Sequence, residues 1–233
     1  MPLFKAVVLD WSGTLVVPIW GPSGAGRPKG GEWIARALTR MGRDASAAEV
    51  GRISAAMVAA EQLPAVAGAL ARGDLSERDF ATAFALWTAA AEIDDALVEA
   101  LRAVNVDPAG GQFAEDAART LAALKAAGMR VAVLSDIHFD LRPWFAHAGL
   151  DQYVDHFVLS FEHGVRKPDP AIFRIALDAL GVAPADALMV GDRAGYDGAA
   201  VDVGLPTLLL PPLTAVTESR LHLVLAACDV TAG

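Results

Sequence analysis

Short, β-branched apolar runs that end in polar residues recur along this chain. The first is FKAVVLD at residues 4–10, a hydrophobic segment that ends in an acidic residue and a Gly-Thr turn. Three later segments follow the same pattern: RVAVLSD (130–136), DHFVLS (155–160) and ALMVGD (187–192); TLLL (207–210) is a fifth candidate strand. Near-continuous apolar runs of this length are typical of strands buried on both faces of a parallel sheet.

Helix-period stretches separate these predicted strands. They cover residues 114–128, 169–181 and 196–204, and two of them end at glycines, Gly128 and Gly181, which suit a helix C′ position. Strands that alternate with helices predict an α/β fold, here a Rossmann-like open parallel sheet with helices on both faces.

The region from residue 18 to 107 interrupts this alternation. It opens with the Gly/Pro-rich stretch PIWGPSGAGRPKGG (18–31), which does not have the spacing of a phosphate-binding P-loop and which we interpret as a hinge. Arg27 and Lys29 in this stretch are alternative substrate contacts. Alanine-rich helical patterns follow at 32–42, 46–60, 76–91 and 94–104. We therefore predict an all-helical cap domain (18–107) inserted into a core domain formed by residues 1–17 and 108–233.

The charge balance excludes several classes of partner. Nineteen basic against 28 acidic residues give a net charge of −9, which is unfavourable for nucleic acid or an anionic membrane. Cys228 is the single cysteine, so an intramolecular disulfide and a cysteine zinc site are excluded. The apolar runs are far shorter than the roughly 20 residues of a membrane helix, and the first does not resemble a signal peptide. We expect a cytoplasmic protein with a small-molecule partner, while the oligomeric state has no sequence signal.

Polar residues capable of chemistry stand at four predicted strand ends or loops. Asp10 follows the first strand, Ser135 ends the second, and Lys167 precedes a proline-initiated helix that would favour an anion. Asp192 and Asp197 flank a glycine-bearing turn after the fourth. Each has a structural alternative, such as a helix cap or a solvated lysine, but ligands of open α/β sheets bind at this edge.

These motifs resemble the haloacid dehalogenase-like hydrolase superfamily over nearly the whole chain. The strand followed by DWSGT is similar to its first motif, VAVLSD to its second, RKPDP to its third and VGDRAGYDGAA to its fourth. The helical stretch also stands where the family places a cap, between the first and second motifs.

The resemblance implies a Mg²⁺-dependent phosphatase acting on a small phosphorylated metabolite. Asp10 would be the nucleophile that forms an aspartyl-phosphate, with Ser135 and Lys167 holding the phosphoryl oxygens. Asp10, the Ser12 carbonyl and Asp192 would ligate Mg²⁺, with Asp197 a direct or water-mediated ligand. Trp11 and Asp136, which adjoin these motifs, are further candidates for substrate or phosphate contact, and Trp20 is another for the pocket wall.

One departure concerns Ser12, where the family's phosphatases have a second Asp as general acid and base. A hydroxyl without a base is a poor proton shuttle, so Ser12 leaves three alternatives open: a C–P hydrolase, a C–halogen hydrolase, or a weakened, phosphate-binding member. Phosphonoacetaldehyde hydrolases have the similar DWAGT, but their cap lysine and third-motif arginine are not matched by Lys29 and Lys167. Dehalogenases use no metal, whereas the two carboxylates of the fourth motif here favour a metal site. The fourth motif therefore argues against a dehalogenase. Asp136 and then His138 are the candidates for the missing base.

Overall fold

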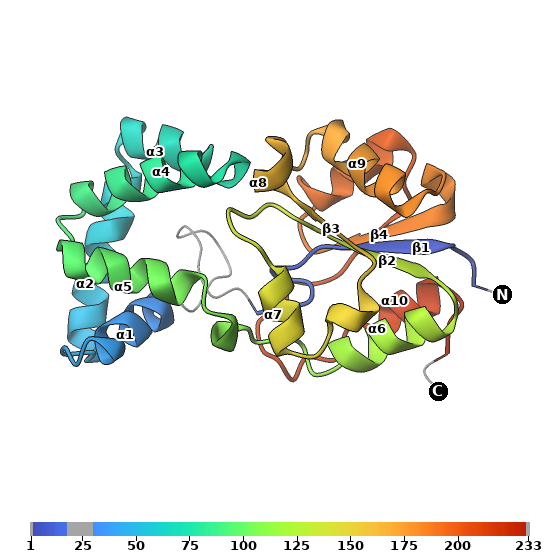
Figure 1. Cartoon of the computed structure of the whole chain (residues 1–233), viewed down its shortest axis with the longest axis horizontal. Helices are drawn as coiled ribbons and strands as arrows, with labels where there is room; N and C mark the ends of the chain where they lie inside the picture. The colour runs from blue at the N-terminus through green and yellow to red at the C-terminus, as the bar shows by residue number, and fades with distance from the viewer. Residues whose placement is uncertain (1, 18–29, 232–233) are drawn as a thin grey trace.

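The computed structural model describes residues 2–17 and 30–231. Its centre is a five-stranded parallel sheet in the order β3-β2-β1-β4-β5 (Figure 1). The strands are β1 (Ala6–Leu9), β2 (Arg130–Ser135), β3 (His156–Leu159), β4 (Ala187–Gly191) and β5 (Thr207–Leu209). All five predicted strands are confirmed. The central strands β1, β2 and β4 are almost entirely buried, whereas β3 and β5 at the two edges of the sheet are partly exposed.

Alternate residues of the strands supply two separate cores. Val7 and Leu9 of β1 pack with α6 (Ala117–Ala126), α7 (Arg142–His147) and α10 (His222–Ala227). Ala6 and Val8 face the other way, toward α9 (Pro170–Leu180). Successive side chains of a strand point to opposite faces, so a strand covered on both sides must be apolar throughout. The predicted doubly covered sheet is confirmed.

Residues 30–105 form a separate group of helices, which we call the helical region (Figure 1). Its elements are α1 (Gly30–Arg40), α2 (Ala47–Glu61), α3 (Pro64–Leu70), the 3₁₀ helix η1 (Gly73–Leu75), α4 (Glu77–Ala90) and α5 (Asp95–Asn105). Ser46, Ser76 and Asp94 begin α2, α4 and α5, each accepting a hydrogen bond from a backbone N–H in the first turn. No strand occurs in these residues.

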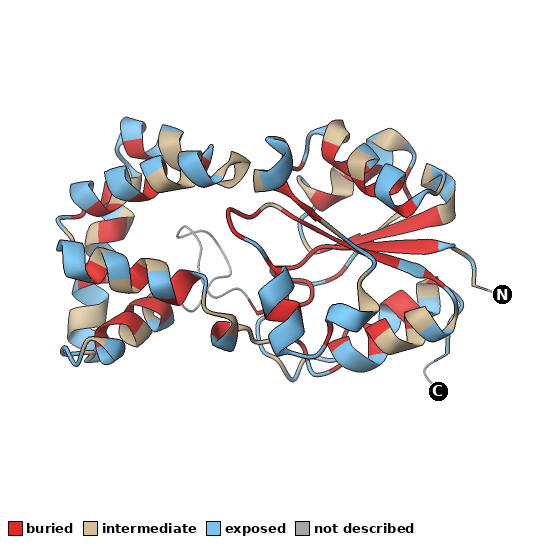
Figure 2. Ribbon diagram, viewed as in Figure 1, coloured by how far each residue is buried: buried red, intermediate tan, exposed pale blue. Residues whose placement is uncertain are grey.

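The helical region has its own apolar core. Buried side chains of α1, α2, α4 and α5, among them Ile34, Ile53, Phe84 and Leu101, form this cluster. Buried segments of these helices are red in Figure 2. Trp33 and Trp87 stack with ring centroids 6.2 Å apart. This core is distinct from the two cores of the sheet, which fits a region that packs largely on itself.

Several short elements differ from the sequence prediction. The stretch 196–204 forms a 3₁₀ helix, η5 (Asp197–Val203), and not an α-helix. The helices α3, α7, α8 (Ser160–His163) and α10 were not predicted, because helices of four to seven residues are too short to show a period. Gly128 and Gly181 do adopt the left-handed conformation expected after a helix, with φ of 77° and 61°.

None of the helices in the described ranges is, on its own, long and apolar enough to cross a membrane.

Candidate active site

The three central strands bring the predicted motifs to one edge of the sheet. Leu9 of β1 pairs with Val133 of β2 and Val190 of β4, so the carboxyl ends of the three strands lie side by side. Asp10 follows β1 directly, Ser135 ends β2, and Asp192 follows β4. Parallel strands in this register deliver their C-terminal residues to a common site.

Lys167 joins two carboxylates at this edge. Its Nζ donates to Oδ1 of Asp10 and to Oδ1 of Asp197, both at 2.6 Å. All three side chains are buried, with Asp197 fully inaccessible and Lys167 only 3% exposed. The helix after Lys167 is capped by Asp169, whose Oδ1 accepts from the N–H of Ala171. The Lys167 ammonium therefore bonds to the two carboxylates and takes no part in capping α9.

Burial dominates the electrostatics of this group. Desolvation raises the pKa of Asp10 from 3.8 to about 7; the Lys167 charge opposes this rise and Asp197 adds to it. Burial would lower the pKa of Lys167, but Asp10, Asp197 and Asp136 outweigh it and raise the pKa above its usual value. The pKa of Asp192 is also raised, by burial and then by the charge of Asp197. Lys167 thus remains a cation beside crowded acids.

Two glycines make room for the carboxylates. Gly13 has φ of 89°, and a Cβ on it would lie 2.6 Å from Oδ2 of Asp192. A Cβ on Gly191 would lie 2.2 Å from Cγ of Asp197. Side chains at these positions would collide with the site, so the glycines of DWSGT and VGD are required by close approach.

The turn after β4 holds Asp197 in place. Oδ2 of Asp197 accepts backbone N–H groups of Asp192 at 3.1 Å and Arg193 at 2.9 Å. Its second oxygen is the one that Lys167 contacts. Asp197 is therefore fixed on both oxygens, which favours a structural and electrostatic role or a metal contact that displaces Lys167.

The donor set fits a divalent cation. Ligand oxygens of Asp10, Asp192 and Asp197 lie within 4.8 Å of one another. Oδ1 of Asp192 is buried and has no hydrogen-bond partner in the described chain. The carbonyls of Trp11 and Gly13 accept backbone hydrogen bonds, whereas in these residues none reaches the carbonyl of Ser12. Mg²⁺ prefers such oxygen ligands, and a buried unpartnered carboxylate oxygen is costly without one.

Ser135 and Asp136 continue the site from β2. Ser135 is buried at the end of the strand. Oδ1 of Asp136 accepts the backbone N–H of Lys167 at 2.9 Å, which ties the second motif to the third. Burial raises the pKa of Asp136, against the opposing Lys167 charge and hydrogen bond. Asp136 is thus placed beside the site, with a pKa above that of a surface acid.

Trp11 lies inside the core. Its indole packs edge-on against Trp144 and Phe139, with ring centroids 5.4 and 6.2 Å away, and is 2% exposed. These contacts favour packing over the predicted substrate contact. Trp20, Arg27 and Lys29 lie outside the described residues.

His138 joins the second motif to the helical region. Its Nδ1 lies 3.2 Å from Oδ1 of Asp74, and its Nε2 lies 2.6 Å from Nδ2 of Asn105. The ring stacks on Phe80 with centroids 3.5 Å apart. Ser160 adds a hydrogen bond to the carbonyl of Asp74 at 2.6 Å. With both nitrogens engaged, His138 is better placed to dock the helical region than to act as the missing base.

Sequence reasoning did not identify two groups of residues at this site. The hydroxyl of Thr14, fully buried, donates to Oδ2 of Asp10 at 3.2 Å; its place in the Gly-Thr turn was the available indication. Asp74 and Asn105, which hold His138, come from helices with no distinguishing motif.

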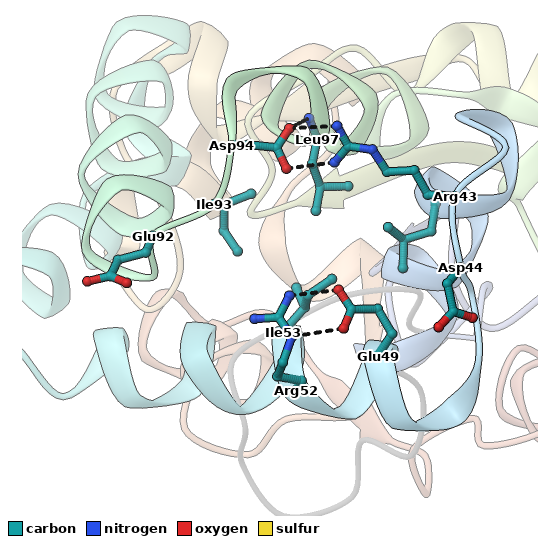
Figure 3. A pocket seen from close by; sticks show the side chains of 10 residues that line it. Arg43, Asp44, Glu49, Arg52, Ile53, Glu92, Ile93, Asp94 and Leu97 are labelled. Carbon is teal, nitrogen blue, oxygen red and sulfur yellow. Dashed lines mark hydrogen bonds and ion pairs between the residues drawn. The ribbon is translucent and has the colours of Figure 1, made fainter.

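A pocket of about 240 Å³ lies elsewhere, in the helical region (Figure 3). Arg43 donates twice to Asp94, at 2.6 and 3.0 Å, and Arg52 twice to Glu49, at 2.8 and 2.7 Å. The two arginines of the pocket are paired with these carboxylates, and none of the predicted site residues lines the pocket. The candidate site is therefore the sheet edge and not this pocket.

Known proteins show similar sequences. The haloacid dehalogenase-like hydrolase family model matches residues 4–201. Glyceraldehyde 3-phosphate phosphatase of Pyrococcus furiosus is 37% identical over 95 residues, 40% of this chain and 39% of that protein. Phosphoserine phosphatase of Thermus thermophilus is 42% identical over 78 residues, 33% and 31% of the two chains. (S)-2-haloacid dehalogenase 4A of Burkholderia cepacia is 33% identical over 135 residues, 56% and 55% of the two chains. The matches thus span between about a third and just over half of these relatives.

Solved structures share the fold. A phosphatase from Thermococcus onnurineus superposes with a TM-score of 0.55 at 21% identity, covering 88% of this chain and 86% of that one. L-2-haloacid dehalogenase from Xanthobacter autotrophicus has a TM-score of 0.61 at 22% identity, covering 89% and 77%. The family match over most of the chain, with its four motifs at one sheet edge, establishes that the chain belongs to the haloacid dehalogenase-like hydrolases.

Proposed function

We propose that this hydrolase is a Mg²⁺-dependent phosphatase that removes phosphate from a small phosphorylated metabolite. The observation that carries the proposal is the cluster of Asp10, Asp192 and Asp197, with ligand oxygens within 4.8 Å and the buried Asp192 Oδ1 unpartnered in the described chain. Three acids packed this closely need a compensating cation in addition to Lys167.

In the proposed reaction, a carboxylate oxygen of Asp10 attacks phosphorus. The bond between phosphorus and the ester oxygen breaks, and its electron pair leaves on that oxygen, which then takes up a proton. Water next attacks the aspartyl-phosphate and releases inorganic phosphate and the free carboxylate. Asp10 is placed for this by its position after β1 and by the hydrogen bond from Thr14.

Asp10, Asp192, the Ser12 carbonyl and Asp197 would hold the Mg²⁺. When bound, the ion supplies positive charge that offsets repulsion between the Asp10 carboxylate and a phosphate dianion. Lys167 and Ser135 would donate to the phosphoryl oxygens, since both lie at the same sheet edge as Asp10. Lys167 then exchanges a carboxylate contact for a phosphoryl contact, without moving from the site.

We propose that the helical region is the cap that selects the substrate. Its own core and its contacts with His138 and Ser160 support a separate body docked over the second motif. The boundaries at residues 18 and 107 remain predictions.

A second candidate is hydrolysis of a carbon–halogen bond. It is favoured by the match to (S)-2-haloacid dehalogenase 4A, which covers 56% of this chain. The cluster of Asp10, Asp192 and Asp197 argues against it, because these residues form a set of metal ligands and the dehalogenases use no metal.

A substrate panel separates these reactions. Purified protein is incubated with phosphate monoesters, a phosphonate and (S)-2-chloropropionate, each with Mg²⁺ or with chelator, and free phosphate and chloride are measured. The proposal requires phosphate release that depends on Mg²⁺ and is absent in Asp10→Asn. Chloride release that survives chelation would support the second candidate and overturn the first.

A further inference from the structure

A buried arginine from the C-terminal segment contacts the loop that carries Asp10. Arg220 stands just before α10 and is 7% exposed. Its Nη2 donates to the carbonyl of Thr14 at 2.6 Å and to that of Gly13 at 3.3 Å, and its Nη1 donates to the carbonyl of Pro211. The guanidinium thus joins residues more than 200 positions apart in sequence.

The segment around Arg220 is itself fixed. Oδ2 of Asp116, at the start of α6, accepts the N–H of Leu221 at 2.9 Å and the hydroxyl of Ser219 at 3.1 Å. These two residues flank Arg220 on either side. On the same segment, Leu213 donates its N–H to the carbonyl of Gly13 at 2.7 Å. The backbone that presents the guanidinium is therefore held at several points.

The contacted carbonyls belong to the turn that orients the nucleophile. The carbonyl of Trp11 accepts the N–H groups of Thr14, Leu15 and Val16, which closes the turn after Asp10. The hydroxyl of Thr14 donates a hydrogen bond to Asp10, and the carbonyl of Thr14 accepts one from Arg220. Rotation of the Thr14 backbone would thus move a direct hydrogen-bond partner of the nucleophile.

We propose that Arg220 is a positioning residue for Asp10, acting through the peptide groups of Gly13 and Thr14. The C-terminal segment then completes the active site, although it lies beyond residues 4–201, the part matched by the family model. The inference rests on the proposed role of Asp10 as nucleophile, but it holds for either a phosphate or a haloacid substrate.

The charge of Arg220 supports this role. Burial lowers the pKa of Arg220, while the charges of Glu218, Asp116 and Asp192 oppose this change. An arginine guanidinium keeps its charge in proteins. A planar guanidinium can bond two carbonyls at once, which a lysine ammonium on a flexible stem does less well. Arg220→Lys should therefore retain part of the positioning effect. Arg220→Met removes all of the hydrogen bonds that the guanidinium makes.

The test compares Arg220→Met and Arg220→Lys with the control Arg119→Met. Arg119 is exposed and donates to the hydroxyl of Ser219 at 3.2 Å, so the control loosens the same segment without touching the turn. We measure kcat and KM per folded protein, on whichever substrate class the wild type turns over, and hydrogen exchange of the amides at residues 13–16.

We expect Arg220→Met to lower kcat by about 10- to 100-fold with KM nearly unchanged, since small misplacements of reacting groups cost this much. Arg220→Lys should fall between it and the wild type, and amide exchange in the turn should rise in Arg220→Met but not in Arg119→Met. A wild-type kcat in both Arg220 variants, or unchanged exchange, would overturn the proposal. If Arg220→Met does not fold, Arg220→Lys decides by the same measures. If the wild type does not hydrolyse phosphate esters, the proposed function is refuted but the role of Arg220 is not. Hydrogen exchange of the amides at residues 13–16 then still tests that role.

Discussion

The ammonium of Lys167 lies 2.6 Å from Oδ1 of Asp10, in a site where both side chains are almost fully buried. The same ammonium contacts Asp197 at equal distance. A buried cation shared between two acids stabilises the arrangement, but Oδ1 of Asp192 is left without a hydrogen-bond partner among the described residues.

Asp10→Asn should abolish hydrolysis and leave the fold intact. The pKa of Asp10 is raised from 3.8 to about 7, so its carboxyl favours folding below pH 3.8 and loses that contribution as pH rises through about 7. At pH 8 the neutral amide should therefore not lower the unfolding temperature. Activity and thermal unfolding are measured together, and mass spectrometry excludes deamidation back to Asp. Near-normal kcat would disprove the nucleophile assignment.

Mg²⁺ should raise the unfolding temperature through Asp192. At an ion concentration about 100 times Kd, mass action adds about 2.7 kcal/mol to the free energy of unfolding. The control is Asp192→Ala, which removes the unpartnered buried oxygen and should show little shift. Equal shifts in wild type and variant would place the ion elsewhere, and a wild type unmoved by millimolar Mg²⁺ would contradict a metal site.

Mg²⁺ binding should also release protons at neutral pH. Metal ligands must be deprotonated, and a pKa of about 7 leaves about half of the Asp10 carboxyls protonated at pH 7. Binding should release about half a proton per ion there, and almost none at pH 9. Affinity should rise with pH up to about 7 and then level off. Calorimetry in buffers of different ionisation enthalpy measures this, and an enthalpy independent of buffer at pH 7 would contradict it.

Ser12→Asp should accelerate steady-state turnover. Attack by Asp10 on p-nitrophenyl phosphate needs little proton transfer, but the water that cleaves the aspartyl-phosphate needs a base, which Ser12 cannot be unaided. The wild type should therefore show a burst proportional to enzyme concentration. The Asp variant should be faster by up to roughly 10²–10⁴-fold, the range of general acid–base catalysis. A linear progress curve with an unchanged rate in Ser12→Asp would make Asp136 the next residue to test.

Gly13→Ala should damage the site more than the fold. With φ of 89° at this position, alanine would strain the backbone. Its Cβ would also lie only 2.6 Å from Oδ2 of Asp192 and would displace that carboxylate. We expect a loss of activity of about 100-fold or more and weaker Mg²⁺ binding. Gly195→Ala is the matched control, because a Cβ there meets no atom within 4 Å. Equal effects of the two changes would show that the close approach to Asp192 is unimportant.

His138→Phe should loosen the docking of the helical region. It leaves the amide of Asn105, which is 3% exposed, without its partner at 2.6 Å. A buried donor left unpaired costs about 1–3 kcal/mol, measured by urea unfolding. Adding Asn105→Leu should recover part of this loss, since both polar partners are then replaced. Additive losses in the double variant would contradict a direct coupling.

Much of the fold could be predicted because its determinants are local. The runs around Val7, Val131 and Leu188 are apolar throughout, and a strand covered on both faces leaves few other arrangements. The long helices α9 and α6 show their period and their terminal glycines. Short helices such as α7 and α10 were not predicted, because one or two turns carry too few residues to show a period.

The sequence by itself indicated which residues are candidates for chemistry: Asp10, Ser135 and the pair Asp192 and Asp197 stand at or after the ends of apolar strands, and Lys167 precedes a proline-initiated helix. The tertiary structure decided which of them meet. It placed Lys167 between Asp10 and Asp197, engaged His138 with Asp74 and Asn105, and brought Arg220 beneath the nucleophile turn. Strand patterns arise from burial and alternation within a few residues, whereas these contacts join segments far apart in sequence and exist only once the chain has packed.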